Sequence, residues 1–179
     1  VMDNKKETKL LLVIMVIGFI LNFIFGLLGS FFSPQSYAQM TFWQAGDSLA
    51  IMASALASVY LGNKDQDIAE AGFVMLGIAY GVSFASSKTN AIDEEIMASI
   101  ILPLVPSLFL ISFCKIFPTW LRISSILVCV PFFFMYKNVI QHTYNHDNLS
   151  NILAYSGIQL LGVLWAFFIY KDYKKQKVL

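Results

Sequence analysis

The sequence predicts an all-α, polytopic integral membrane protein built as a bundle of six transmembrane helices. Apolar residues make up 58% of the 179 residues and charged residues only 13%, whereas soluble domains carry about 25% charged residues. A helix of about twenty apolar residues crosses the hydrocarbon core of a bilayer. The chain forms a single membrane domain, 1–179, in which such stretches recur at 10–32, 43–62, 69–87, 95–114, 119–137 and 149–170.

The basic residues predict how this bundle is oriented. Ten of the twelve Lys and Arg residues fall on one side of the six spans, and only Lys88 and Lys137 fall on the other. By the positive-inside rule, both termini are expected to be cytoplasmic. We therefore expect a multi-pass protein of the cell membrane, with a bacterial inner membrane as its location. The net charge of +1 argues against a nucleic-acid partner. Membrane lipids are expected partners, because the basic run from Lys171 to Lys177 can contact anionic headgroups.

The first two spans differ in their polarity. The span 10–32 contains no charged residue, whereas the second contains Asp47. A span of about twenty residues that ends at Gly62 begins near Trp43, which places Asp47 about one turn inside the outer boundary. A carboxylate at this depth predicts a partner or a water-filled pocket. Ser33 followed by Pro34 predicts a helix N-cap before this span.

Small residues at four-residue spacing mark the second and third spans. Such residues let helix backbones approach closely. We expect the two spans to be antiparallel neighbours, and the same faces offer contacts for a homo-oligomer or hetero-oligomer. The residues concerned are Ala50, Ser54 and Ser58 in the second span, and Gly77, Gly81 and Ala85 in the third.

Proline interrupts the later spans. Pro103 and Pro106 predict a kink in the fourth span, because each removes a backbone donor and leaves the carbonyl four residues earlier unbonded. The freed carbonyls belong to Ser99 and Leu102, and we expect this stretch to face protein or water. In the fifth span, Arg122 lies near the cytoplasmic end, where its side chain can reach the interface.

Polar side chains within the spans predict a binding pocket near the membrane midplane. The candidate residues are Asn22, Asp47, Ser54, Tyr80 and Gln159. The leading hypothesis is that they bind a small-molecule solute, or carry it across the membrane, with access from the outer face through Asp47. The alternative is that the same groups only form hydrogen bonds between helices, each worth about 0.6 kcal/mol.

A second set of polar residues lies on the outer side of the predicted bundle. If the fifth helix continues past Lys137, His142 and His146 share one helix face at i, i+4 spacing. With a carboxylate such as Glu94 or Asp47, that arrangement can bind Zn²⁺ or Cu²⁺. It would then support a second hypothesis, an enzyme that acts on a lipid or a metal-activated substrate at the outer leaflet. Helix capping explains the same residues without a metal.

Enzyme motifs do not decide between these hypotheses. The sequence contains no HExxH, GxSxG or Walker A motif, so an enzymatic role is open but less favoured. Apart from Zn or Cu at the outer face, no cofactor is expected. A third hypothesis is an accessory subunit whose helices pack against the partners of a membrane complex.

Overall fold

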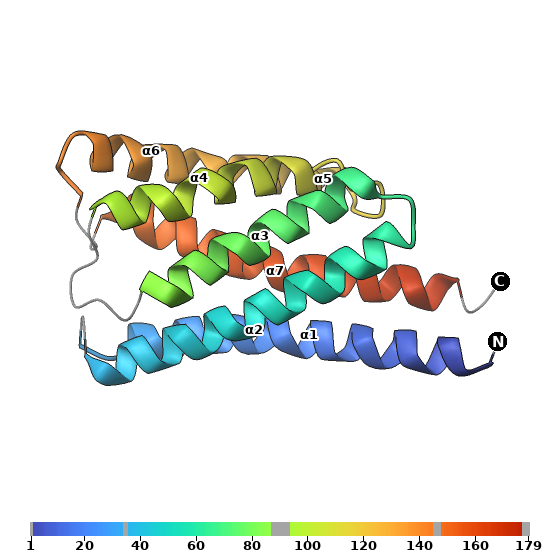
Figure 1. Cartoon of the computed structure of the whole chain (residues 1–179). Coiled ribbons are helices and arrows are strands. Elements are labelled where there is room, and N and C mark those ends of the chain that lie inside the picture. The colour runs from blue at the N-terminus through green and yellow to red at the C-terminus, as the bar shows by residue number, and fades with distance from the viewer. Residues whose placement is uncertain (1, 34–35, 87–93, 145–147, 177–179) are drawn as a thin grey trace.

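The computed structural model describes residues 2–33, 36–86, 94–144 and 148–176, with the side chains of residues 2–5 and 94–96 left undescribed. All secondary structure in these ranges is helical (Figure 1). The helices are α1 (Met2–Ser30), α2 (Tyr37–Gly62), α3 (Asp67–Ser86), α4 (Glu94–Ile111), α5 (Thr119–Leu127), α6 (Cys129–Ile140) and α7 (Leu149–Lys175).

By length and composition, the helices suit a membrane. Five segments are long and apolar enough to cross it, with α5 and α6 together providing one of them (Thr119–Ile140), and Met97–Ile111 forms a shorter apolar helix. Large apolar side chains also cover the outside of the bundle. Leu102, Phe133 and Leu149 are each more than 60% exposed, as expected where lipid rather than water surrounds the protein. The helical bundle is therefore confirmed, and its helices suit a multi-pass membrane protein by length and composition.

The helices form a closed ring in chain order. Helices α1, α2 and α3 each pack on the next helix in the chain, and α4 packs on both α5 and α6. Helix α6 packs on α7, and α7 packs on α1. Figure 1 shows the start of α1 and the end of α7 at the same end of the bundle, together with the connections α2–α3 and α4–α5. This arrangement agrees with an even number of crossings. Which side of the membrane this end faces stays a prediction.

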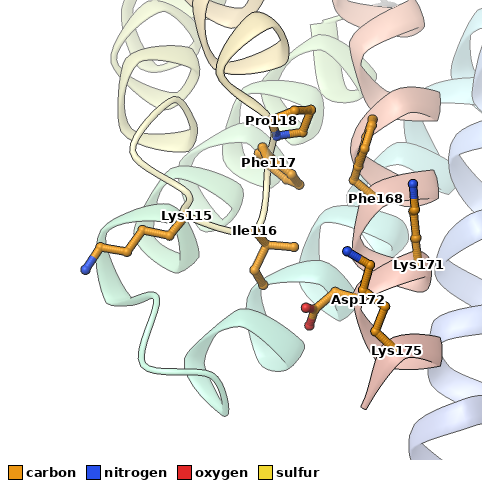
Figure 2. Close-up of a pocket in the computed structure, with 8 residues that line it drawn as sticks. All are labelled: Lys115, Ile116, Phe117, Pro118, Phe168, Lys171, Asp172 and Lys175. Atoms are coloured by element: carbon orange, nitrogen blue, oxygen red, sulfur yellow. The ribbon is translucent and has the colours of Figure 1, made fainter. Parts of the chain in front are cut away.

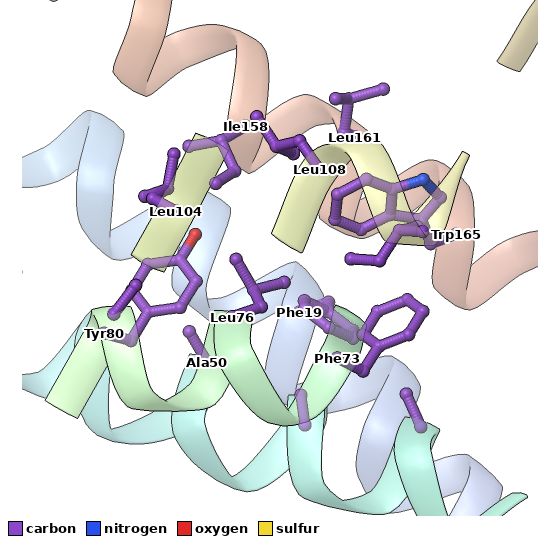
Figure 3. Close-up of a cluster of buried hydrophobic side chains, with 14 of the residues drawn as sticks. Phe19, Ala50, Phe73, Leu76, Tyr80, Leu104, Leu108, Ile158, Leu161 and Trp165 are labelled. Atoms are coloured by element: carbon purple, nitrogen blue, oxygen red, sulfur yellow. The ribbon is translucent and has the colours of Figure 1, made fainter. Parts of the chain in front are cut away.

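Aromatic side chains fill the centre of the ring (Figure 3). Phe73 of α3 meets Phe19 of α1 and Trp165 of α7 edge to face, with ring centroids 6.4 Å and 5.4 Å apart. The indole Nε1 of Trp165 donates a hydrogen bond to Ser125 Oγ on α5 at 3.3 Å. Edge-to-face pairs contribute about 0.5–1.5 kcal/mol beyond burial, so this cluster joins four helices across the ring.

The small residues of α2 and α3 pack inside the chain. Ala50, Ala53 and Ser54 are fully buried. A methyl group added at Gly18 would lie 3.0 Å from Ala53 Cβ, and one added at Gly77 would lie 3.7 Å from Ser54 Cβ. The stripes therefore bring α1, α2 and α3 close together, as small residues do between membrane helices. An oligomer through the same faces stays a prediction.

Two local expectations were wrong. The N-cap of α2 is Ser36 rather than Ser33, and its hydroxyl accepts a hydrogen bond from Gln39 N at 3.2 Å. On α4, Ser99 and Leu102 lie on the exposed side of the helix. The apolar side chains of Ile100 and Leu104 occupy the inner side instead, because packing decides which face of this uniformly apolar helix is buried. The helix is continuous through Pro103 and Pro106, and its kink stays a prediction.

The fifth predicted span is divided. Residue Val128 separates α5 from α6. Pro131 lies three residues beyond this break and has no N–H to donate to the Leu127 carbonyl, so the helix cannot continue regularly across it. The Val128 side chain packs on Gly157 of α7, where an added methyl group would lie 3.0 Å from Val128 Cγ2.

Candidate functional site

A small cavity, with a few polar side chains in a mostly apolar wall, lies where α2, α3, α4 and α7 meet. Its volume is about 30 Å³. A buried water needs about 10–15 Å³ on this measure, so the cavity has room for about two water molecules. The lining residues are Asp47, Ala79, Tyr80, Ser83, Ile100, Leu104, Tyr155, Ile158 and Gln159.

Asp47 supplies the carboxylate of this cavity. It is half-buried on α2, and the Ser83 hydroxyl of α3 donates a hydrogen bond to it. Acidic residues within membrane segments are rare, face the bundle interior and pair with other polar groups. The partner that the sequence predicted for Asp47 is therefore a serine on the neighbouring helix, which reduces the cost of removing a carboxylate from water.

Two tyrosines approach the cavity from different helices. Tyr80 precedes Ser83 by three residues and lies on the same face of α3, and Figure 3 shows its hydroxyl pointing toward Leu104 and Ile158. Tyr155 comes from α7, and its hydroxyl lies 3.5 Å from the Met97 sulfur. A thioether is a weak acceptor, so this contact leaves the Tyr155 oxygen available as an acceptor toward the cavity.

Gln159 closes the cavity on the side of α1. It follows Tyr155 by one turn of α7, and its amide packs directly against Gly26 of α1. A methyl group added at Gly26 would collide with this amide, since it would lie 2.5 Å from Gln159 Oε1. The absence of a side chain at Gly26 thus allows an amide to lie between α1 and α7.

The structure brings together three of the five residues predicted for the pocket: Asp47, Tyr80 and Gln159 line it. Asn22 is 2% exposed and packs beside Gly46, where an added methyl group would lie 3.3 Å from its Nδ2. Ser54 lies two turns along α2 from Asp47 and faces Gly77. These two residues are buried polar groups outside the cavity.

Sequence reasoning missed two residues of the site, Ser83 and Tyr155. The spacing along each helix gave a signal for both residues. Ser83 is three residues from the predicted Tyr80, and Tyr155 is four residues from the predicted Gln159. Residues three or four apart share a helix face. Serine and tyrosine are nevertheless common on the faces of membrane helices, and the spacing does not show which face is turned inward.

The predicted metal site is only partly described. Helix α6 ends at Ile140, and His142 is exposed in a left-handed conformation with φ of 53°. His142 therefore lies beyond the helix, and the predicted helical i, i+4 pair with His146 does not begin there. His146 and the side chain of Glu94 lie outside the described residues. Within the described ranges, no three His, Cys, Asp or Glu side chains come together, so binding of Zn or Cu stays a prediction.

No protein-family model matches the sequence, and no curated protein or solved structure matches it significantly.

Proposed function

We propose that the protein binds a small solute at Asp47 and carries it across the membrane. The supporting observation is the cavity in which the Asp47 carboxylate, its partner Ser83 and three further polar side chains meet between four helices. An ionisable residue inside a membrane segment points to a substrate or ion pathway. Binding sites in membrane transporters also lie between helices, within the membrane.

The chemistry of the cavity favours a cation. Asp47, Ser83 and Gln159 offer a carboxylate, a hydroxyl and an amide oxygen, and the tyrosines offer two phenol oxygens. Hard cations prefer oxygen ligands of these kinds. Among the described residues of the lining there is no Lys, Arg or His, so the Asp47 carboxylate, when ionised, attracts positive charge.

The size of the cavity sets the class of solute. A volume of about 30 Å³ accommodates about two water molecules, which suits a dehydrated monovalent cation or a hydrated proton. A solute of metabolite size would need α4 or α7 to move away from α2, because these helices supply opposite walls of the cavity.

The proposal is tested with the full chain in liposomes. Entrapped dyes that respond to pH or to sodium or potassium report flux after a gradient of each ion is imposed. Asp47→Asn keeps the shape of the side chain and removes its charge, so we expect it to lower saturable flux at least about tenfold, equivalent to about 1.4 kcal/mol. Asp65→Asn in the exposed connection between α2 and α3 is the matched control, and it should leave flux unchanged.

Two results would contradict the proposal. One is a wild-type protein that gives no more flux than empty liposomes for any of these cations. The other is an equal loss of flux in Asp47→Asn and Asp65→Asn. The outer-leaflet enzyme and the accessory subunit stay untested predictions.

A further inference from the structure

A larger pocket lies at the end of the bundle where α1 begins and α7 ends (Figure 2). Its volume is about 260 Å³, and it shares no residue with the Asp47 cavity. The connection between α4 and α5 forms one wall, and the last turns of α7 form the other. The lining residues are Lys115, Ile116, Phe117, Pro118, Phe168, Lys171, Asp172 and Lys175.

Three lysines give this pocket a net positive charge. Figure 2 shows the Lys175 ammonium group between Ile116 and Asp172, with Lys171 beside Phe168 and Lys115 extending from the opposite rim. All three are exposed, and no ion pair joins them to a carboxylate in the described part of the chain. Their ammonium groups can therefore rotate toward an anion without breaking an existing ion pair.

Asp172, the one acidic side chain among the described residues of the pocket, is already engaged. Asp172 Oδ2 accepts hydrogen bonds from Tyr60 Oη at 3.0 Å and from Gln176 Nε2 at 2.9 Å. In Figure 2 its carboxylate points away from Phe168. The carboxylate therefore offsets only part of the field of the three lysines, and an anion remains the favoured occupant.

The other side of the pocket is apolar and continues onto the lipid-facing surface. Trp120 packs edge to face on Phe168, with ring centroids 5.8 Å apart. Beyond them, Ile123 of α5 and Phe167 of α7 are 51% and 56% exposed. A positive rim that passes directly into an exposed apolar surface fits a ligand with an anionic head and apolar tails.

We propose that this pocket binds the phosphate headgroup of an acidic phospholipid, with the acyl chains along the exposed surface of α5 and α7. Its volume lies just below the range of about 300–1,000 Å³ found for small-molecule sites. It therefore suits a headgroup rather than a whole lipid. Basic clusters at the membrane surface are known to recognise anionic headgroups. The site is independent of the function proposed for Asp47.

The test measures binding of dioctanoyl phosphatidylglycerol to the detergent-purified full chain by native mass spectrometry. Dioctanoyl phosphatidylcholine and inorganic phosphate serve as comparison ligands. The triple variant K115Q/K171Q/K175Q should weaken binding of phosphatidylglycerol at least about tenfold, because it removes the charge-assisted contacts that these lysines would make to the phosphate. The control K6Q/K9Q/K174Q removes the same charge from the same end of the bundle, and it should lose less than about threefold because none of its lysines lines the pocket.

Three results would overturn the proposal. Equal losses in the two triple variants would mean diffuse attraction to the basic end of the bundle. Equal binding of phosphatidylcholine and phosphatidylglycerol would mean that charge is not recognised. Displacement of the lipid by millimolar inorganic phosphate would mean a site for soluble anions. The variant K115R/K171R/K175R keeps the charge and should keep binding, and K175Q alone gives the same direction of change if the glutamine triple does not fold.

Discussion

The Tyr60 hydroxyl on α2 donates a hydrogen bond of 3.0 Å to the Asp172 carboxylate on α7, between residues 112 positions apart in the chain. Helices α2 and α7 are not adjacent in the ring, because α1 lies between them. The bond therefore links two separate helices at one end of the bundle. Gln176 donates to the same carboxylate oxygen and also contacts Lys64 of the α2–α3 connection. The result is a small polar network that holds the ends of α2 and α7 together.

Replacing Tyr60 with Phe should lower the free energy of unfolding by about 1 kcal/mol. Hydrogen bonds between side chains of membrane helices average about 0.6 kcal/mol, and bonds to charged groups are stronger. Unfolding in mixed micelles with rising SDS, followed by circular dichroism, measures the change. Tyr37→Phe is the control, because Tyr37 is 89% exposed; an equal effect of both changes would contradict a role for the Asp172 bond.

Gly72 and Gly81 offer a matched pair on α3. A methyl group at Gly72 would lie 2.8 Å from Ile111 Cγ1 and 2.9 Å from the Ile111 backbone nitrogen, whereas one at Gly81 meets nothing within 4 Å. Gly72→Ala should therefore destabilise the protein by about 1–3 kcal/mol. Gly81→Ala should be neutral or stabilising by up to about 1 kcal/mol, because alanine favours helix. The same unfolding assay decides, and similar effects at both sites would contradict the close approach of α3 to α4.

Two buried serines should respond in opposite directions. The Ser54 hydroxyl is buried without a hydrogen-bond partner among the described residues, so Ser54→Ala should raise stability by up to about 1 kcal/mol. Ser125 donates to the Leu121 carbonyl and accepts from Trp165 Nε1. Ser125→Ala should lower stability by about 1–3 kcal/mol, because it leaves the indole N–H buried and unbonded. Thermal unfolding in detergent compares the two, and a stability loss at Ser54 would indicate a partner for its hydroxyl.

Membrane orientation can be read from single cysteines at opposite ends of α2. In intact cells, Tyr37→Cys should react with an impermeant thiol reagent and Asn63→Cys should not, because the basic residues predict that the Asn63 end is cytoplasmic. Cys114 and Cys129 are both buried, so background labelling should be low, and the parent protein measures it. Labelling of Asn63→Cys alone would reverse the predicted orientation.

The fold follows from patterns that act over a whole span. Six apolar stretches predict the crossings because lipid demands about twenty apolar residues each time, and small residues on α2 and α3 predict their close packing. The exact ends of helices are harder to predict from the sequence, because they depend on single hydrogen bonds. Ser33 and Ser36 are both acceptable N-caps by type, and only the geometry of the turn before Gln39 selects Ser36.

The candidate site is only partly predictable for a different reason. Asp47 stands out because a carboxylate in lipid needs a partner, and Tyr80 and Gln159 follow from their depth. The rotation of each helix about its own axis is not encoded by polarity when the helix is apolar on all sides. Thus Ser99 of α4 faces outward, Asn22 packs beside Gly46, and Tyr155 turns inward.

The closed ring of helices has a consequence for engineering the chain. Because α7 packs on α1, and α7 ends at the end of the bundle where α1 begins, a flexible linker can join the end of α7 to the start of α1 without crossing the membrane. New ends can then be opened in the exposed turn between Gly62 and Asp67, where circular permutation is best tolerated. Such a permutant would begin with α3 and finish with α2, yet every helix would keep both of its neighbours.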